Sequence, residues 1–125
     1  MFGPGTGTVD PAVLEQSERL SCLIPVSEAN SVGAVWKATW RAEWAGKVRV
    51  PVMFAFAELD CWFEGSREHL RECVEAFSAS PRVDGSFVLG APHCMELSLW
   101  SRGWYARCFG FAMECAVISS SGNKA

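Results

Sequence analysis

Two residues with the chemistry of an acid and a base, Asp60 and His93, each follow a short apolar run of strand character. The runs cover residues 48–57 and 86–89. Side chains at like ends of neighbouring parallel strands can meet, because open α/β sheets hold ligands outside the carboxyl ends of their strands. A carboxylate beside an imidazole orients it as a base. The pattern predicts acid–base chemistry, although no G-x-S-x-G nucleophile motif occurs in the 125 residues.

Other ionisable residues are weaker candidates for the same role. Glu58 would lie deeper along its strand, Glu96 is placed to cap the last helix, and Asp84 precedes a glycine in a predicted turn. His69 falls at the edge of the polar face of a helix and is interpreted as a surface residue. Asp60 itself has an alternative interpretation as a loop carboxylate.

The two apolar runs predict a parallel sheet. In residues 48–57 both alternating sets of side chains are apolar, as in strands that are covered on both faces, and Pro51 lies near the start, where one missing donor is tolerated. A helical pattern over residues 66–78 separates this run from residues 86–89. Strand, helix, strand in this order predicts a right-handed crossover between parallel neighbours.

The remaining pattern is helical. A helix is predicted over residues 11–21, with Asp10 as its N-cap. A second helix is predicted from residue 27 or 30 to residue 44, and Gly46 stops it. A last helix is predicted over residues 98–116. A loop is expected over residues 1–10 and a polar tail over residues 119–125.

Three tryptophans, Trp36, Trp40 and Trp44, recur every four residues along one face of the second predicted helix. An aromatic face of this kind must be covered. One interpretation is a helix that packs on its own domain. The other is a cap helix whose indoles line an apolar substrate pocket.

Composition limits the class of protein. Half of the residues are hydrophobic and a fifth are charged, which excludes disorder for most of the chain, and a net charge of −3 gives no reason to expect nucleic acid or an anionic membrane as partner. The N-terminus lacks the features of a secretory signal, and the apolar runs are shorter than a membrane helix. We therefore expect a soluble, cytoplasmic, single-domain protein.

Six cysteines occur without a C-x-x-C pair and are interpreted as reduced, mostly buried thiols. Cys61 and Cys94 follow Asp60 and His93 directly, which raises the question of zinc. Ligand pairs with metal-binding spacing are absent from the sequence, so neither metal nor cofactor is predicted.

Several segments follow a common pattern: the strand that ends at Asp60, and the segments Gly90-Ala91-Pro92-His93-Cys94-Met95-Glu96-Leu97-Ser98, Trp104-Tyr105 and Phe109-Gly110-Phe111-Ala112-Met113-Glu114-Cys115-Ala116. In these segments the chain resembles the C-terminal part of the α/β-hydrolase fold, and more narrowly a group of fungal α/β hydrolases. The resemblance covers about residues 9–117 and corresponds to the last third of such an enzyme.

This resemblance implies that Asp60 is the catalytic acid and His93 the base of a Ser, Asp, His triad. It also implies one partial domain, in which residues 1–46 form cap helices, residues 47–117 carry the last two strands, and residues 118–125 form a tail. The nucleophile elbow and oxyanion loop of the family would precede this segment. Two strands covered on both faces cannot complete a sheet, so the chain is expected to pair with further sequence, a partner chain or a second copy.

Two functions of different classes follow. The first is the C-terminal segment of a serine-type hydrolase for a small-molecule ester or thioester, in the kind of secondary metabolism found in fungi, inactive without its nucleophile. The second is a non-catalytic remnant or interaction module that binds a partner through its exposed strand edge.

Overall fold

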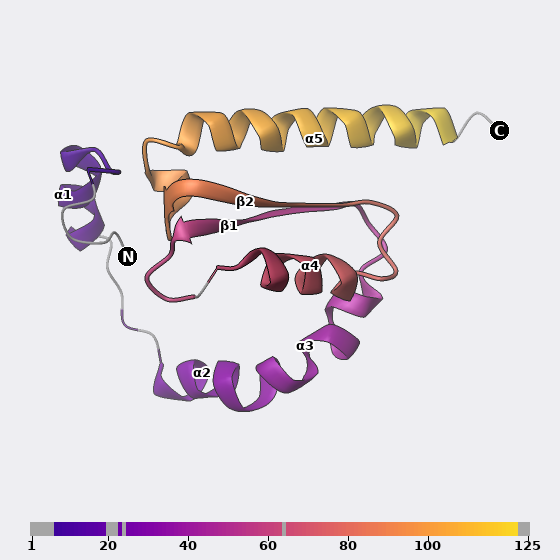
Figure 1. Cartoon of the computed structure of the whole chain (residues 1–125), viewed down its shortest axis with the longest axis horizontal. Helices are drawn as coiled ribbons and strands as arrows, with labels where there is room; N and C mark the ends of the chain where they lie inside the picture. Colours follow the sequence, from indigo (N-terminus) through magenta and orange to yellow (C-terminus); the bar gives the residue numbers. More distant parts are fainter. Residues whose placement is uncertain (1–6, 20–22, 24, 64, 123–125) are drawn as a thin grey trace.

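The computed structural model describes residues 7–19, 23, 25–63 and 65–122. Its centre is a pair of parallel strands, β1 (Val52–Leu59) and β2 (Val83–Pro92). Helix α4 (Arg67–Ala76) connects them on one side of the sheet, and helix α5 (Ser101–Gly122) runs along the other side (Figure 1). The predicted α/β class, with parallel neighbouring strands and an intervening helix, is confirmed.

Strand β1 begins four residues later than predicted and continues to Leu59. Its first donor to β2 is the N–H of Val52, which lies 2.9 Å from the carbonyl oxygen of Arg82. Before Val52, the carbonyl oxygen of Val50 accepts the hydroxyl of Ser80 at 2.8 Å, so this part of the chain bonds a side chain instead of β2.

Strand β2 is longer than predicted, and the turn expected at Asp84-Gly85 is wrong. Both residues lie within β2, where Gly85 is the register partner of Phe54. A Cβ atom at Gly85 would lie 2.6 Å from Cγ2 of Val74 and 3.1 Å from Cδ1 of Leu70. The glycine is therefore a place where α4 approaches the strand closely, which sequence patterns do not distinguish from a turn.

Two predicted helix starts agree with the structure. Helix α1 (Pro11–Arg19) begins after Asp10, whose Oδ1 accepts the N–H of Ala12 at 2.8 Å; residues 20–22, the predicted end, lie outside the described residues. Helix α4 begins after Ser66, whose Oγ accepts the N–H of His69 at 3.0 Å. It ends two residues before the predicted boundary.

The second predicted helix is a run of three helical segments over residues 26–43, which we call the helical arm. It consists of α2 (Val26–Ser31), the π-helix η1 (Val32–Trp36) and α3 (Lys37–Glu43). The backbone leaves helical geometry at Trp44, before the predicted end at Gly46, and a 3₁₀ turn, η2 (Ala45–Lys47), follows. The arm passes below α4 in Figure 1, and an Arg41–Glu72 ion pair of 2.6 Å joins the two.

Helix α5 differs from the prediction at both ends. It begins after a 3₁₀ turn, η3 (Met95–Leu97), and it continues through Gly122 into the segment predicted as a polar tail. The hydroxyls of Ser120 and Ser121 donate to the carbonyl oxygens four residues earlier, at 2.8 and 2.9 Å. Serine hydroxyls can thus be satisfied within a helix, and a serine run need not end one.

The core is small and lies at the carboxyl ends of the strands. Ala57, Ala91 and Met95 are buried there, and Trp100 and Trp104 pack against them. Of the five cysteines that the structure describes, only Cys94 is buried, so the expectation of mostly buried thiols is wrong for these five: Cys61 is exposed, and Cys73, Cys108 and Cys115 are half-buried. Cys22 lies outside the described residues. Within the described part of the chain, no helix is long and apolar enough to cross a membrane.

Candidate acid–base site

Asp60 and His93 form a hydrogen bond of 2.8 Å between Oδ2 of the carboxylate and Nδ1 of the ring. Asp60 directly follows the last residue of β1, and His93 directly follows the last residue of β2. The two side chains are 13% and 25% exposed, respectively. The prediction that they lie within hydrogen-bonding reach is confirmed, whereas their catalytic roles stay predictions.

A bulge in β2 brings the two residues level. Ala57 is the register partner of Val88, but two positions later in β1 Leu59 pairs with Pro92, so β2 carries two extra residues. Gly90 lies in this irregular segment with a φ of +71°, a conformation that glycine adopts without strain. Without these extra residues His93 would lie beyond the end of β1.

Glu58 stabilises this bulge. Its Oε2 accepts the N–H of Gly90 at 2.7 Å. Glu58, the alternative to Asp60 in the sequence, therefore bonds the backbone of β2 and not the imidazole of His93.

The second oxygen of Asp60 organises the loop after β1. Oδ1 accepts the N–H groups of Trp62 at 2.8 Å and Phe63 at 2.9 Å. Burial raises the pKa of Asp60, but the hydrogen bonds from His93 and from these two amides outweigh it, so the pKa of the carboxyl lies below its usual value. An ionised carboxylate at Nδ1 favours the tautomer with a proton on Nδ1, which leaves Nε2 to accept one.

Two aromatic rings of the same loop lie close to the imidazole, and one of them stacks on it. The ring of Trp62 is 5.7 Å from that of His93 at an interplanar angle of 14°, and the ring of Phe63 is 5.9 Å away at 31°. These contacts restrict the plane of the imidazole. Sequence reasoning missed both residues, although their position directly after Asp60 was the available signal.

The pair opens on a cavity of about 760 Å³. Its walls are mainly aromatic and come from the helical arm, β1, α4 and α5; they include Trp36, Trp40, Phe54, Phe56, Phe77 and Trp104. None of the described lining residues is Lys or Arg. Pockets of this size and character bind small apolar molecules.

Two of the three tryptophans of the predicted helix face lie in the wall of this cavity. The rings of Trp36 and Trp40 stack at 5.8 Å with an angle of 20°, and both line the cavity. Trp44 is 64% exposed and is not among the lining residues, because the backbone departs from the helix at that position. Residues four apart drift by about 40° in an α-helix. Val32, the first residue of the π-helix, lines the same cavity as the two rings.

His69 also lines the cavity. Its interpretation as a surface residue did not predict this position. It is exposed, and its ring lies 5.5 Å from that of Phe56. Cys73, one turn later on α4, lines the same wall. The spacing of four residues between His69 and Cys73 was the signal that both lie on the side of α4 facing the sheet.

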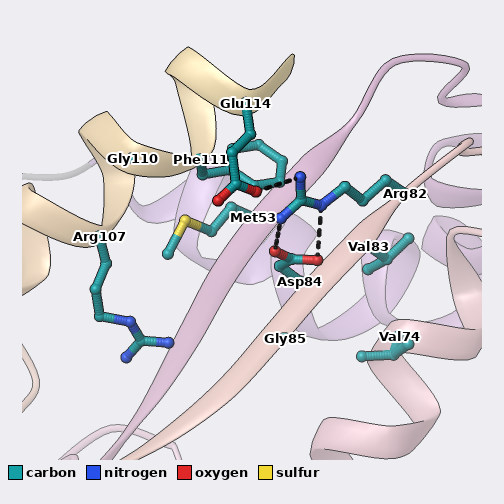
Figure 2. Close-up of a pocket in the computed structure, with 10 residues that line it drawn as sticks. All are labelled: Met53, Val74, Arg82, Val83, Asp84, Gly85, Arg107, Gly110, Phe111 and Glu114. Carbon is teal, nitrogen blue, oxygen red and sulfur yellow. Dashed lines mark hydrogen bonds and ion pairs between the residues drawn. The ribbon is translucent and has the colours of Figure 1, made fainter. Parts of the chain in front are cut away.

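A second cavity, of about 660 Å³, lies between α5 and the sheet at the other end of the strands. Figure 2 shows Arg82 reaching two carboxylates there: Nη2 lies 2.6 Å from Asp84, and Nη1 lies 2.7 Å from Glu114 of α5. The guanidinium also lies 4.8 Å from the centre of the Phe111 ring. These contacts attach α5 to the start of β2.

Among the described residues, no group of three or more His, Cys, Asp and Glu side chains is placed to hold a metal ion. Comparisons of the chain with protein-family models, with curated proteins and with solved structures find no match. The resemblance to α/β hydrolases stays a prediction.

Proposed function

We propose that Asp60 and His93 are the acid and base of a serine-type α/β hydrolase that acts on an ester or thioester of an apolar small molecule. The observation that carries the proposal is the 2.8 Å bond between residues at like ends of adjacent parallel strands. In this role Nε2 of His93 takes the proton of a serine hydroxyl and later returns it to the leaving group. Asp60 holds the tautomer and stabilises the imidazolium.

The nucleophile has to come from polypeptide outside the described site. Ser98 is buried and its hydroxyl donates to the carbonyl oxygen of Met95 at 2.7 Å, while the hydroxyl of Ser66 caps α4. Ser86 lies within β2, seven residues before His93. None of these serines has the flanking glycines of a nucleophile elbow.

The cavity favours an uncharged acyl or aryl group. Its described lining carries the carboxylates of Asp60 and Glu96 but no Lys or Arg. An anionic substrate would meet like charge without a compensating cation. The aromatic walls would instead bind an apolar group and exclude water from the reacting centre.

Mapping the 5′ end of the transcript that encodes this chain, followed by expression of the longest open reading frame, tests the proposal. We expect an in-frame G-x-S-x-G segment after an apolar strand, and turnover of a nitrophenyl ester that is lost in His93→Ala. His69→Ala is the matched control, because it removes the other imidazole of the same cavity. A longer protein without such a segment, or one equally active with His93→Ala, would overturn the assignment.

The 125-residue chain by itself should not hydrolyse esters. An oriented acid and base retain only residual catalysis without a nucleophile and an oxyanion hole. The measurement is the release of nitrophenol from a short-chain ester, compared with buffer alone. Turnover above buffer that disappears in His93→Ala would reveal a nucleophile within the chain, and Ser98 and Cys94 would be the first residues to replace.

A second candidate function is an interaction module without catalysis. It is favoured by one observation, the outer edge of β1, beside which the described residues place no further strand. An apolar strand edge is a template for pairing with another chain.

A further inference from the structure

The loop after β1 contacts the imidazole of His93 both at its edge and on its face. The carboxylate of Asp60 bonds Nδ1 at the edge of the ring, and the indole of Trp62 stacks on the face at 5.7 Å and 14°. Asp60 also fixes the backbone of Trp62, because Oδ1 accepts the N–H of that residue at 2.8 Å. One turn of the chain therefore supplies both contacts of the same ring.

Burial does not account for the position of this indole. Trp62 is 65% exposed, whereas Trp100 and Trp104 pack against the core. An aromatic side chain that lies mostly in water gains little from the hydrophobic effect. The stacking contact with His93 is therefore the interaction best able to hold the indole in place.

Trp62 and Phe63 differ in their relation to the cavity. Phe63 and His93 line it, and Trp62 is not among its described lining residues. The indole therefore contacts the imidazole without forming part of the wall that we assign to substrate. A residue placed in this way can affect the reaction through His93 and not through the binding of substrate.

The reaction of the proposed hydrolase turns His93 into a cation. When Nε2 takes the serine proton, the neutral imidazole becomes an imidazolium whose Nδ1 proton remains hydrogen-bonded to Asp60. The face of an aromatic ring is electron-rich and attracts a cation within about 6 Å, and the indole of tryptophan does so most strongly. The 5.7 Å stack meets this distance. It favours the charged form of His93 over the neutral form.

We propose that Trp62 is a positioning residue that stabilises the imidazolium of His93 through the face of its indole. This role rests on the proposed hydrolase function, and it adds a second stabilising contact to the one that Asp60 makes. Phe63 lies at 5.9 Å and at a larger angle of 31°, has the weaker aromatic face, and contributes to the wall of the cavity instead.

Other ionisable groups lie around the same imidazole. They are Asp60, which bonds it, Cys61 and Cys94, the chain neighbours of the pair, and Glu96, His69 and Cys73, which line the same cavity. None of these groups changes when Trp62 is replaced. An effect of the replacement on the protonation of His93 therefore reports on the indole.

Protonation of His93 in the 125-residue chain tests the contact without catalysis. Tryptophan analogues with one, two and three ring fluorines at position 62 keep the shape of the indole and progressively weaken the negative charge of its face. We expect His93, followed by the NMR shifts of its ring nitrogens, to lose its proton at a lower pH with each added fluorine. His69, the other histidine of the chain, is the internal control and should not respond.

Steady-state kinetics of the longer hydrolase supplies the second measurement. We expect Trp62→Leu to lower kcat about 2- to 5-fold with KM unchanged, as for the loss of a cation–π contact at an exposed site. Phe63→Leu is the matched control and should mainly raise KM, because Phe63 lines the cavity. An effect of Trp62→Leu confined to KM would assign the indole to substrate binding and overturn the proposal.

The two measurements separate failure of this proposal from failure of the hydrolase assignment. A fluorine series that leaves the protonation of His93 unchanged would overturn the role of Trp62, even if Trp62→Leu lowers kcat, because packing alone would then explain the loss. A graded response in the 125-residue chain supports the contact. If the longer protein then shows no ester turnover that depends on His93, the hydrolase assignment is wrong and the stabilised imidazolium remains.

Discussion

The Asp60–His93 pair and the Arg82–Asp84–Glu114 cluster lie at opposite ends of the same two strands and differ in what their charges can do. In the first, the imidazole of His93 bonds one carboxylate oxygen and lies beside the rings of Trp62 and Phe63. In the second, a permanent cation meets two carboxylates that are 41% and 62% exposed. Only the first offers a ring nitrogen that can take up and release a proton, because guanidinium groups stay protonated. The second attaches a helix, and hydrogen-bonded charge alone therefore does not identify a catalytic site.

The largest difference between the two clusters should appear in catalysis by the longer hydrolase that we propose. We expect His93→Ala to lower kcat on the order of 10⁶-fold and Asp60→Asn on the order of 10⁴-fold, as in other triads. Asp84→Asn, the matched change in the second cluster, should leave kcat unchanged. Steady-state assays of the three variants measure this, and an equal loss in Asp84→Asn would remove the distinction.

Packing near the second cluster should show the next largest effect. Gly85→Val forces a side chain against Val74 and should lower the free energy of unfolding by about 1–3 kcal/mol. Gly110→Ala is the control: a Cβ there meets nothing within 4 Å, and alanine should stabilise α5 by up to about 1 kcal/mol. Urea unfolding followed by circular dichroism gives both values. Changes of the same sign would contradict the close approach of α4 at Gly85.

The acid limb of stability should separate the two aspartates. Hydrogen bonds from Arg82 lower the pKa of Asp84, although burial opposes them, and the pKa of Asp60 is also lowered. Each carboxylate therefore stabilises the folded state above the unfolded-state pKa of about 3.9. That contribution is lost as the pH falls through the lower folded-state pKa. Asp60→Asn and Asp84→Asn should each weaken this pH dependence.

Salt should distinguish these two contributions. Asp84 is the more exposed, so about 1 M NaCl, where the Debye length is about 3 Å, should remove most of its effect. The effect of Asp60 should persist, because its side chain is mostly covered. Unfolding free energies between pH 2 and pH 6 at low and high salt test the distinction, and loss of both effects in salt would contradict it.

Arg82→Met should have the smallest effect. It keeps an unbranched side chain of similar length but removes the ion pairs to Asp84 and Glu114 and the contact with Phe111. Because exposed ion pairs contribute little, we expect a small decrease in Tm at low salt that disappears at high salt. A large decrease, or one independent of salt, would assign a structural role to the packing of the arginine stem.

Part of this structure could be predicted from the sequence because it depends on local patterns. The apolar runs before Asp60 and His93 identified both strands, and the intervening helical pattern required a crossover that leaves them parallel. The two candidate residues, Asp60 and His93, then followed from their positions at the strand ends. Their 2.8 Å contact follows from the strand topology, and the periodicity of the sequence is enough to predict that topology.

The rest depends on contacts between distant segments. The bulge that aligns His93 with Asp60 needs Glu58 to bond the backbone of Gly90, 32 residues later. Gly85 follows Asp84, a pair typical of a turn. It lies instead within β2, at a position where Val74 of α4 packs closely against the strand. The end of the helical arm before Trp44 excludes that indole from the cavity. No local pattern distinguishes these outcomes from their alternatives.

The carboxylate of Asp60 joins one local contact to one distant contact, and this has a consequence for the order of folding. Its bonds to the amides of Trp62 and Phe63 close a turn of only a few residues, which forms at little entropic cost. The bond to His93 spans 33 residues and has to wait until β2 docks. We expect the turn to form first and to hold the carboxylate in place, so that the imidazole arrives at an acceptor that is already oriented.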